Sequence, residues 1–384
     1  MQEPSAIAVP AISRLLVRSV NWLGDAVMTT PALQRLRERF PHAKITLLTQ
    51  AKLASLWDGL ACVDEILTLQ DSETPWAVAR RLRGQALDAA LIFPNSPRSA
   101  LEPWLARIPR RIGYGTPWRG WLLTQPLKHS PPRLLPRRLS TRDVKRRINN
   151  ATPANAGRYE HQMLDYLRLA AALGSNPLPL PPKLHVSESE IEGALATLQG
   201  LLGSKKMDRT GGHLVWLGIN ASAAYGPAKC WPVERFAAAA RQVAQTVSNC
   251  VWLSFGTEAD RNVGEQLAGL SGGTILNLAG KTSLRQLMAL LKTCRVLLTN
   301  DSGPMHVAAA LGTPVVAPFG STSPDLTAPG EPGDPRHHLL TGGAPCSPCF
   351  RRACPIDFRC MTAITVDQVV AAVLAALTRA MSDG

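Results

Sequence analysis

The chain has 384 residues, more than one hydrophobic core usually serves, so two domains of ordinary size are expected. An apolar content of 45% with 18% charged residues excludes an intrinsically disordered chain, and no uncharged apolar run reaches the roughly 18 residues of a membrane span. The net charge of +14 indicates an anionic partner, and the start, MQEPSAIAVPAIS, does not resemble a secretory signal, so a cytoplasmic location is expected.

The first half of the chain alternates predicted strands and helices. Short apolar runs predict strands over residues 15–20, 44–49, 65–70 and 87–93, and helical spacing predicts helices over residues 26–40, 75–85 and 159–173. Residues 115–157 are rich in Pro and Arg and show little periodicity. They predict a long excursion from the compact fold, of the kind that is usually functional or mobile.

A basic segment overlaps this excursion. Between Arg98 and Arg147 there are thirteen Lys or Arg residues, and the only acidic residues there are Glu102 and Asp143. Such a segment attracts nucleic acid, anionic lipid headgroups or nucleotide sugars. A solvated loop whose charge only aids solubility explains the composition equally well.

The second half repeats the alternation more clearly. Four prolines within residues 175–186 remove backbone donors and predict an interdomain linker. Strands are then predicted over residues 213–219, 251–255, 295–300 and 314–320, with helices over residues 232–247, 258–270, 283–291 and 303–311. Buried strands that alternate with helices indicate a parallel sheet covered on both faces. Two such domains place a cleft at the carboxyl ends of their strands.

Residues that follow the predicted strands are the first candidates for chemistry. The segment DSGPMH places Asp301, Ser302, Gly303 and His306 at the start of a helix, where free N–H groups and the helix dipole favour a phosphate. Helix capping by Asp301 or Ser302, with His306 in the core, is the simpler alternative.

Two further charged residues occupy comparable positions. Lys229 precedes a predicted helix in a loop of small residues, where a cation can balance the charge of a leaving phosphate, although an isolated surface lysine is commoner. Asp25 follows the first predicted strand and Gly24. It can serve as a general base toward a hydroxyl group, or simply as an N-cap.

Four segments together resemble a known family. NWLGDAVMTTPALQRLRERFP, FPNSPRSALEPWLARIPRRIGY, YGPAKCWP and TNDSGPMHVAAALGTPVVAPFGSTSPDLTAP are similar to the lipopolysaccharide heptosyltransferases of glycosyltransferase family 9, most of all to the type II enzymes. The resemblance runs from about residue 15 to about residue 329 and keeps the order of the motifs in both halves.

The resemblance implies an α/β fold of the GT-B type, with two Rossmann-like domains and a cleft between them. On this basis residues 1–180 form an acceptor-binding domain and residues 181–365 a nucleotide-sugar-binding domain. Residues 366–384 form a final helix that is able to pack back on the first domain.

The same resemblance implies a function. It is inverting transfer of heptose from ADP-heptose to the phosphorylated heptosyl-Kdo-lipid A core at the inner leaflet of the inner membrane, without a required cofactor. A family 9-like enzyme that uses another nucleotide sugar or acceptor is the alternative.

Site residues also follow from the resemblance. Asp25 matches the catalytic base. The donor site comprises Lys229, Asp301, Ser302, Gly303, His306, Ser222, Tyr225 and Gly256, and the acceptor contacts are Arg18, Asn95, Ser96 and Arg98.

Four of the eight cysteines lie close together in the sequence, at Cys346, Cys349, Cys354 and Cys360. Four thiolates can enclose a structural zinc ion, but the spacing is not that of paired knuckles. Free thiols or an oxidation-sensitive pair are the alternatives.

Two other classes of protein compete with the glycosyltransferase. The basic charge favours a nucleic-acid-binding protein, but no aromatic platform or nucleic-acid motif accompanies it. The alternating sheet favours a nicotinamide-dependent dehydrogenase, but no Gly-x-Gly-x-x-Gly follows the first strand.

Overall fold

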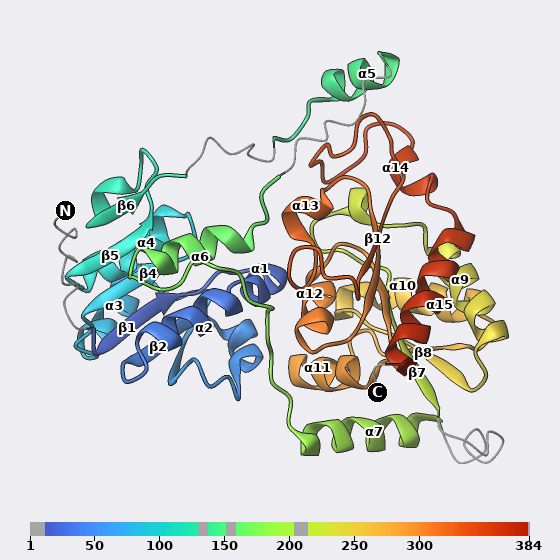
Figure 1. The fold of residues 1–384 in the computed structure, drawn as a ribbon, viewed down its shortest axis with the longest axis horizontal. Helices are drawn as coiled ribbons and strands as arrows, with labels where there is room; N and C mark the ends of the chain where they lie inside the picture. Colours follow the sequence, from blue (N-terminus) through green and yellow to red (C-terminus); the bar gives the residue numbers. More distant parts are fainter. Residues whose placement is uncertain (1–11, 130–136, 151–158, 203–213, 383–384) are drawn as a thin grey trace, which may run out of the picture. The chain divides into compact units, whose positions relative to one another are not determined.

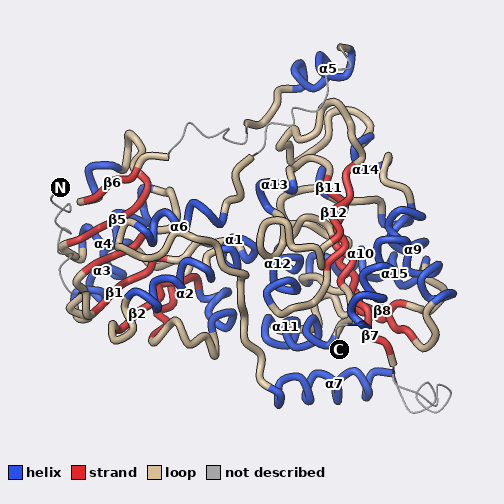
Figure 2. The backbone as a smooth tube through the Cα atoms, in the orientation of Figure 1, coloured by secondary structure: helices blue, strands red, loops and turns tan. Residues whose placement is uncertain are grey.

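The computed structural model of this chain describes residues 12–129, 137–150, 159–202 and 214–382. They belong to two compact units, whose helices and strands are shown in Figures 1 and 2. Unit 1 comprises Met1–Arg133 and Gln162–Leu180, and unit 2 comprises Leu134–His161 and Pro181–Gly384. Among the described residues, no helix is both long enough and apolar enough to cross a membrane.

Unit 1 is built on a six-stranded sheet in the order β3-β2-β1-β4-β5-β6. All of its strand pairings are parallel. The strands are β1 (Arg14–Arg18), β2 (Lys44–Gln50), β3 (Glu65–Leu69), β4 (Ala89–Ile92), β5 (Arg110–Tyr114) and β6 (Gln125–Leu127). The order reverses between β1 and β4, and in sheets of this kind ligands bind beside the carboxyl ends of the strands at that reversal.

Helices cover the sheet of unit 1. They are α1 (Leu23–Met28), α2 (Thr30–Arg39), α3 (Pro75–Arg83), α4 (Pro97–Leu105) and α6 (Met163–Ala171), with short 3₁₀ turns η1 (Ala51–Trp57) and η2 (Gly120–Leu122). The helix α3 packs beside α4, and α2 beside α6. Alternate strand residues such as Leu16, Leu48 and Ala90 are buried against Val78 of α3 and Ala100 of α4.

Unit 2 repeats this plan with the strand order β12-β11-β10-β7-β8-β9, again with parallel pairings. The strands are β7 (Val215–Asn220), β8 (Cys250–Ser254), β9 (Ile275–Asn277), β10 (Leu297–Thr299), β11 (Val315–Phe319) and β12 (His338–Thr341). Here the order reverses between β7 and β10. Two parallel α/β units were predicted from the alternation of apolar runs, and this prediction is confirmed.

The helices of unit 2 are α5 (Thr141–Asn149), α7 (Glu188–Leu202), α9 (Val233–Thr246), α10 (Arg261–Leu270), α11 (Leu284–Thr293), α12 (Gly303–Ala310), α13 (Pro324–Thr327), α14 (Arg359–Thr362) and α15 (Val366–Ser382). Short 3₁₀ turns η3 (Pro227–Lys229) and η4 (Glu258–Asp260) precede α9 and α10. The main core of the unit gathers side chains from the sheet, from α9 and from α15, including Trp252, Phe236 and Val373.

The division of the chain differs from the expected domain boundary at one segment. Residues 134–161 were assigned to the first domain, but Leu139 and Val144 are buried in the core of unit 2, and the Leu139 N–H donates to the Cys349 carbonyl oxygen at 2.9 Å. The final helix α15 lies beside α9 (Figure 1) and also packs against β11 and β12 of unit 2, because its apolar face, with Val369 and Val373, completes that core.

Several elements were not predicted from the sequence. The strands β6 and β9 have three residues each, which is too short for a recognisable period of two. The helix α4 contains Pro97 and Pro103, and prolines weaken a helix prediction. The strands β5 and β12 and the helices α5 and α7 were also missed.

Candidate active site

The loops that follow β7 and β10 meet at the strand-order reversal of unit 2. Asn300 comes directly after β10 and is fully buried. Its side-chain oxygen accepts from the backbone N–H of Trp231 at 2.9 Å, and its side-chain nitrogen donates to the Ala221 carbonyl oxygen at 2.7 Å. This single amide therefore holds the two loops that carry the predicted donor residues against each other.

An ion pair connects those loops directly. The Nζ atom of Lys229 lies 2.6 Å from Oδ2 of Asp301, and the two side chains are only 12% and 4% exposed. The Asp301 carboxylate also accepts from Thr322 at 2.6 Å and from Thr327 at 3.4 Å. Asp301 thus fixes the position of Lys229, and the two threonines are functional candidates that sequence reasoning missed, although they lie within the quoted family motif.

The N-terminus of α12 lies beside this pair. Ser302 is the N-cap residue and has the extended backbone usual for that position, but its side chain makes no capping hydrogen bond. The Ser302 hydroxyl instead lies 3.1 Å from the Thr299 hydroxyl. The side chains of Ser302 and Asp301 make no capping hydrogen bond, so that part of the simpler alternative is not observed, whereas its other part, a buried His306, is. The positive end of the helix dipole remains next to Gly303, as anion binding would require.

His306 lies one turn into α12, and its side chain is buried. Burial lowers its pKa to about 4; the Asp301 carboxylate opposes this shift, and His161 and Lys229 add smaller lowering effects. The imidazole is therefore neutral at pH 7. It can exchange a hydrogen bond with a ligand, but it adds no positive charge.

The loop that carries Lys229 is braced by a later segment of the chain. The Tyr225 hydroxyl donates to the Phe350 carbonyl at 2.9 Å, and the Ala228 N–H donates to the Arg352 carbonyl at 2.9 Å. The Tyr225 ring has Lys229 Nζ 4.9 Å and the Arg352 guanidinium carbon 5.4 Å from its centroid. Sequence reasoning missed Arg352, which brings a second cation to this ring.

Ser222 and Gly256 are less directly connected. Ser222 lies in the loop after β7 and is half-buried, and Gly256 follows β8. A Cβ atom on Gly256 would lie 2.7 Å from the Asp260 Cβ, so close packing explains this glycine. Within the described ranges, no hydrogen bond or ion pair joins either residue to Lys229 or Asp301.

Asp25 belongs to the helix that follows β1 in unit 1, as Gly303 and His306 belong to the helix that follows β10 in unit 2. It lies in the first turn of α1, the first helix after β1, and its side chain is partly exposed. The N-cap of this helix is Trp22, so Asp25 is not the cap that the alternative interpretation required. A carboxylate in the first turn is stabilised by the helix dipole.

Arg18 and Arg98, two predicted acceptor contacts, share one buried carboxylate. The Nε atom of Arg18 lies 3.0 Å from Oε2 of Glu102, and that of Arg98 lies 3.2 Å from Oε1. Arg18 is 3% exposed and also donates to the Ser19 carbonyl at 2.6 Å, which favours a structural role for it. Arg98 is about half exposed and remains accessible.

The other two predicted acceptor contacts follow β4. Ser96 is the N-cap of α4, and its hydroxyl accepts from the Ser99 N–H at 3.3 Å. Asn95 is exposed, and its side-chain oxygen accepts from Nη1 of Arg119 at 3.2 Å. Arg119 entered the sequence analysis only as one of thirteen basic residues. Its sequence signal is Gly113 in β5, since a glycine inside a strand marks a close approach of other atoms.

The cysteine cluster lies near the bracing segment of unit 2. Cys346, Cys349 and Cys360 are buried, and all four thiols are free. Burial raises the pKa of Cys360 to about 12 and also raises the pKa values of Cys346 and Cys349. Across the part of the chain that the structure describes, no group of three or more His, Cys, Asp or Glu side chains is arranged to hold a metal ion. The zinc interpretation therefore gains no support.

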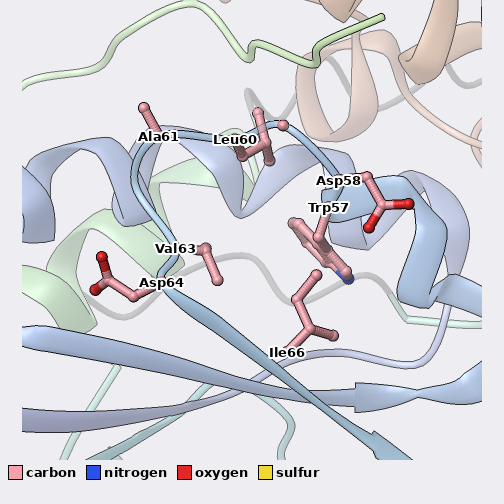
Figure 3. Close-up of a pocket in the computed structure, with 8 residues that line it drawn as sticks. Trp57, Asp58, Leu60, Ala61, Val63, Asp64 and Ile66 are labelled. Atoms are coloured by element: carbon pink, nitrogen blue, oxygen red, sulfur yellow. The ribbon is translucent and has the colours of Figure 1, made fainter.

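A shallow pocket in unit 1 lies elsewhere, between η1 and β3 (Figure 3). It is lined by Trp57, Asp58, Gly59, Leu60, Ala61, Val63, Asp64 and Ile66. The Asp64 carboxylate is occupied by Arg37 and by the Ile45 N–H. None of the predicted site residues lines this pocket, so we do not assign it to the chemistry.

Comparisons with known proteins identify the family of this chain. Residues 75–358 match the model of glycosyltransferase family 9 (heptosyltransferase). The chain is 31% identical over 329 residues to lipopolysaccharide heptosyltransferase 2 of Salmonella typhimurium, which covers 82% of this chain and 85% of the relative. It is 32% identical, with the same coverage, to lipopolysaccharide heptosyltransferase 2 of Escherichia coli.

Solved structures show the same similarity. The E. coli ADP-heptose lps heptosyltransferase II superposes with a TM-score of 0.71 at 26% identity, covering 95% of this chain and 99% of that one. A glycosyl transferase family 9 protein from Veillonella parvula gives a TM-score of 0.74 at 21% identity, covering 96% and 97%, which supports the fold alone.

Proposed function

This chain belongs to glycosyltransferase family 9, and we propose that it transfers heptose from ADP-heptose to the heptosyl-Kdo-lipid A inner core of lipopolysaccharide. Membership of this family argues against the dehydrogenase and the nucleic-acid-binding protein as alternatives. The heptosyltransferase 2 relatives, each matched over most of its length, support heptose and the inner core as substrates.

The observation that carries the proposal is the arrangement at the strand-order reversal of unit 2. Lys229, fixed by Asp301, lies beside the uncapped N-terminus of α12. A fixed cation and a helix N-terminus are suited to a diphosphate leaving group, whose negative charge grows as the glycosidic bond breaks. His306 is buried nearby in neutral form, and Tyr225 contacts Lys229. On this mechanism no divalent metal is required.

The reaction proposed is a single displacement with inversion. Asp25 accepts the proton of the acceptor hydroxyl while that oxygen bonds to the anomeric carbon. The bond from the anomeric carbon to the diphosphate breaks at the same time, and its electron pair leaves with ADP. Inversion requires the base and the leaving group on opposite faces of the sugar. Asp25 belongs to unit 1, and Lys229 and Ser302 belong to unit 2.

We propose that the enzyme binds its acceptor at the inner-membrane surface. The net charge of +14 supports attraction to an anionic lipid surface. Asn95, Ser96 and Arg98 are proposed acceptor contacts because they follow β4, at the reversal of unit 1.

The test is the substitution Asp25→Asn, assayed with ADP-heptose and a defined inner-core acceptor. Loss of the base should lower kcat by roughly 10²-fold or more, with ADP affinity unchanged, because the donor groups lie in unit 2. Asp71→Asn, an exposed carboxylate of unit 1, is the matched control and should leave kcat unchanged. Full activity of the Asp25→Asn enzyme would remove Asp25 from the mechanism.

The identity of the nucleotide is tested separately by thermal unfolding with ADP, UDP, GDP and NAD. A ligand that binds only the folded protein raises the midpoint of unfolding. We expect ADP to give the largest increase. A larger increase with UDP or GDP would favour the alternative, a family 9 enzyme with another nucleotide sugar.

A further inference from the structure

The cysteine-rich segment of unit 2, residues 346–360, places a second cation beside Lys229. Arg352 of this segment has an exposed side chain, and its guanidinium carbon lies 5.4 Å from the centroid of the Tyr225 ring. Lys229 Nζ lies 4.9 Å from the same centroid, so the two charged groups are no further apart than the sum of these distances. Within the described residues, no carboxylate pairs with the Arg352 guanidinium, so its charge is not cancelled locally.

The backbone of Arg352 is held against the loop that carries Lys229. Its carbonyl oxygen accepts from the Ala228 N–H at 2.9 Å, and a Cβ atom on Gly226 would lie 2.6 Å from the same oxygen. Both contacts use the main chain of Arg352, so they brace the loop without its guanidinium. The charged group therefore extends from a fixed point of the chain and remains available to a ligand.

The same segment is tied to the residues that hold Asp301. The Phe350 N–H donates to the Ser321 carbonyl oxygen at 2.7 Å, and the hydroxyl of the next residue, Thr322, donates to Asp301 Oδ2 at 2.6 Å. The segment is thus fixed on one side to the loop after β11 and on the other to the loop after β7. The cysteine-rich segment, which had no assigned role, therefore belongs to the surroundings of the proposed donor site.

The charge balance of the proposed donor site is incomplete without a further cation. Lys229 and Asp301 form an ion pair at 2.6 Å, so together they add no net charge. His306 is neutral at pH 7, because burial lowers its pKa to about 4. The N-terminus of α12 contributes roughly half a positive charge. The diphosphate of a nucleotide sugar is an anion that gains further negative charge as ADP leaves, and these groups do not balance it.

We propose that Arg352 binds the diphosphate of the donor and stabilises the negative charge that grows on it as the glycosidic bond breaks. Arginine can keep the face of its guanidinium on an aromatic ring while its N–H groups donate, in their own plane, to phosphoryl oxygens. Arg352 therefore keeps its contact with Tyr225 when it binds the donor, and it transfers no proton. The inference rests on the proposed function for the identity of the donor.

Ligand binding is the first test, with inorganic pyrophosphate as the probe of the diphosphate site. Without ligand, Arg352→Met should unfold at the wild-type temperature, because the exposed side chain does not brace the loop. Pyrophosphate, compared with chloride at equal ionic strength, should raise the unfolding midpoint of the wild type and should raise that of the variant much less. The Kd of ADP should rise roughly 10- to 100-fold, the loss expected for charge-assisted hydrogen bonds.

Steady-state kinetics are the second test. Arg352→Met should lower kcat roughly 10-fold or more, because the missing charge matters most when the leaving group develops its own, and the KM of the acceptor should stay unchanged. Arg352→Lys keeps the charge and should recover part of both losses. Arg295→Met is the matched control and should have wild-type kinetics, because Arg295 is an exposed cation that precedes β10 at its amino end.

Two results would overturn the inference. One is an Arg352→Met enzyme that pyrophosphate stabilises as much as it stabilises the wild type, with kcat unchanged. The other is an equal loss of ADP affinity in Arg352→Met and Arg295→Met, which indicates a general effect of net charge. Failure of the proposed function has a different signature, because the wild-type enzyme then releases no ADP from ADP-heptose in the presence of the acceptor. In that case the pyrophosphate comparison still decides whether Arg352 binds a diphosphate.

Discussion

The ion pair between Lys229 and Asp301 combines a structural role with a chemical one. Both side chains are largely buried, so removal of one partner leaves the other charge unpaired. We predict that Lys229→Met lowers the free energy of unfolding by about 3–5 kcal/mol and lowers kcat by roughly 10²-fold. Urea unfolding and steady-state kinetics measure the two effects.

A double variant separates the two roles. Lys229→Met combined with Asp301→Asn leaves no buried charge, so it should recover part of the lost stability. It should not recover kcat, because the cation that faces the leaving group is still absent. Recovery of both would show that Lys229 acts only through the fold.

His306 predicts a dependence of stability on pH. Its pKa is about 4 in the folded protein and about 6.5 when unfolded. The unfolded state therefore binds more protons between these values, and stability that is complete above pH 6.5 is lost as the pH falls toward 4, by up to about 3 kcal/mol. His337 adds a contribution of the same sign.

The measurement is urea unfolding between pH 4 and 7 for the wild type, His306→Gln and the exposed His42→Gln. His306→Gln should show a shallower decline than the wild type, and His42→Gln should follow the wild type. If the free energy of unfolding fell equally steeply with decreasing pH in all three proteins, His306 would already be protonated or exposed in the folded state.

The loop between β7 and α9 depends on one glycine. Gly226 has φ of 145°, and a Cβ atom there would lie 2.6 Å from the Arg352 carbonyl oxygen, which accepts from the Ala228 N–H. Residues that carry a side chain rarely adopt this φ, and the Arg352 backbone cannot move aside as a flexible side chain can. We predict that Gly226→Ala lowers the free energy of unfolding by about 2 kcal/mol and weakens ADP binding, because Lys229 is three residues away.

The control is a glycine with open space. Gly200 lies on the exposed face of α7, and a Cβ atom there meets nothing within 4 Å. Gly200→Ala should stabilise the protein by about 0.5–1 kcal/mol, since alanine favours a helix. If both substitutions had the same effect on unfolding and on ADP binding, the contact of Gly226 with Arg352 would not hold in solution.

The charge of the whole chain leads to a prediction about membranes. With a net charge of +14, the protein should sediment with vesicles that contain anionic lipid at low salt. Raising the salt to about 0.5 M should release it, because added ions screen exposed charges. Neutral phosphatidylcholine vesicles are the control, and no binding to either vesicle would contradict a peripheral location.

Local sequence patterns determined the class of the fold and the main candidates. Apolar runs and amphipathic spacing depend on near neighbours, so they predicted most strands and the two parallel units. The residues after β1, β7 and β10 were found for the same reason, because the end of a strand is visible in the sequence.

Only the tertiary structure decided what those candidates contact. Lys229 and Asp301 are 72 positions apart, and their ion pair follows from the reversal of strand order between β7 and β10. Arg119 was one basic residue among thirteen until the structure placed its side chain in a buried position next to Asn95. Leu139, Val144 and α15 belong to unit 2 because their apolar side chains complete its core. Burial and pairing depend on residues that are distant in the chain, and a local pattern does not carry that information.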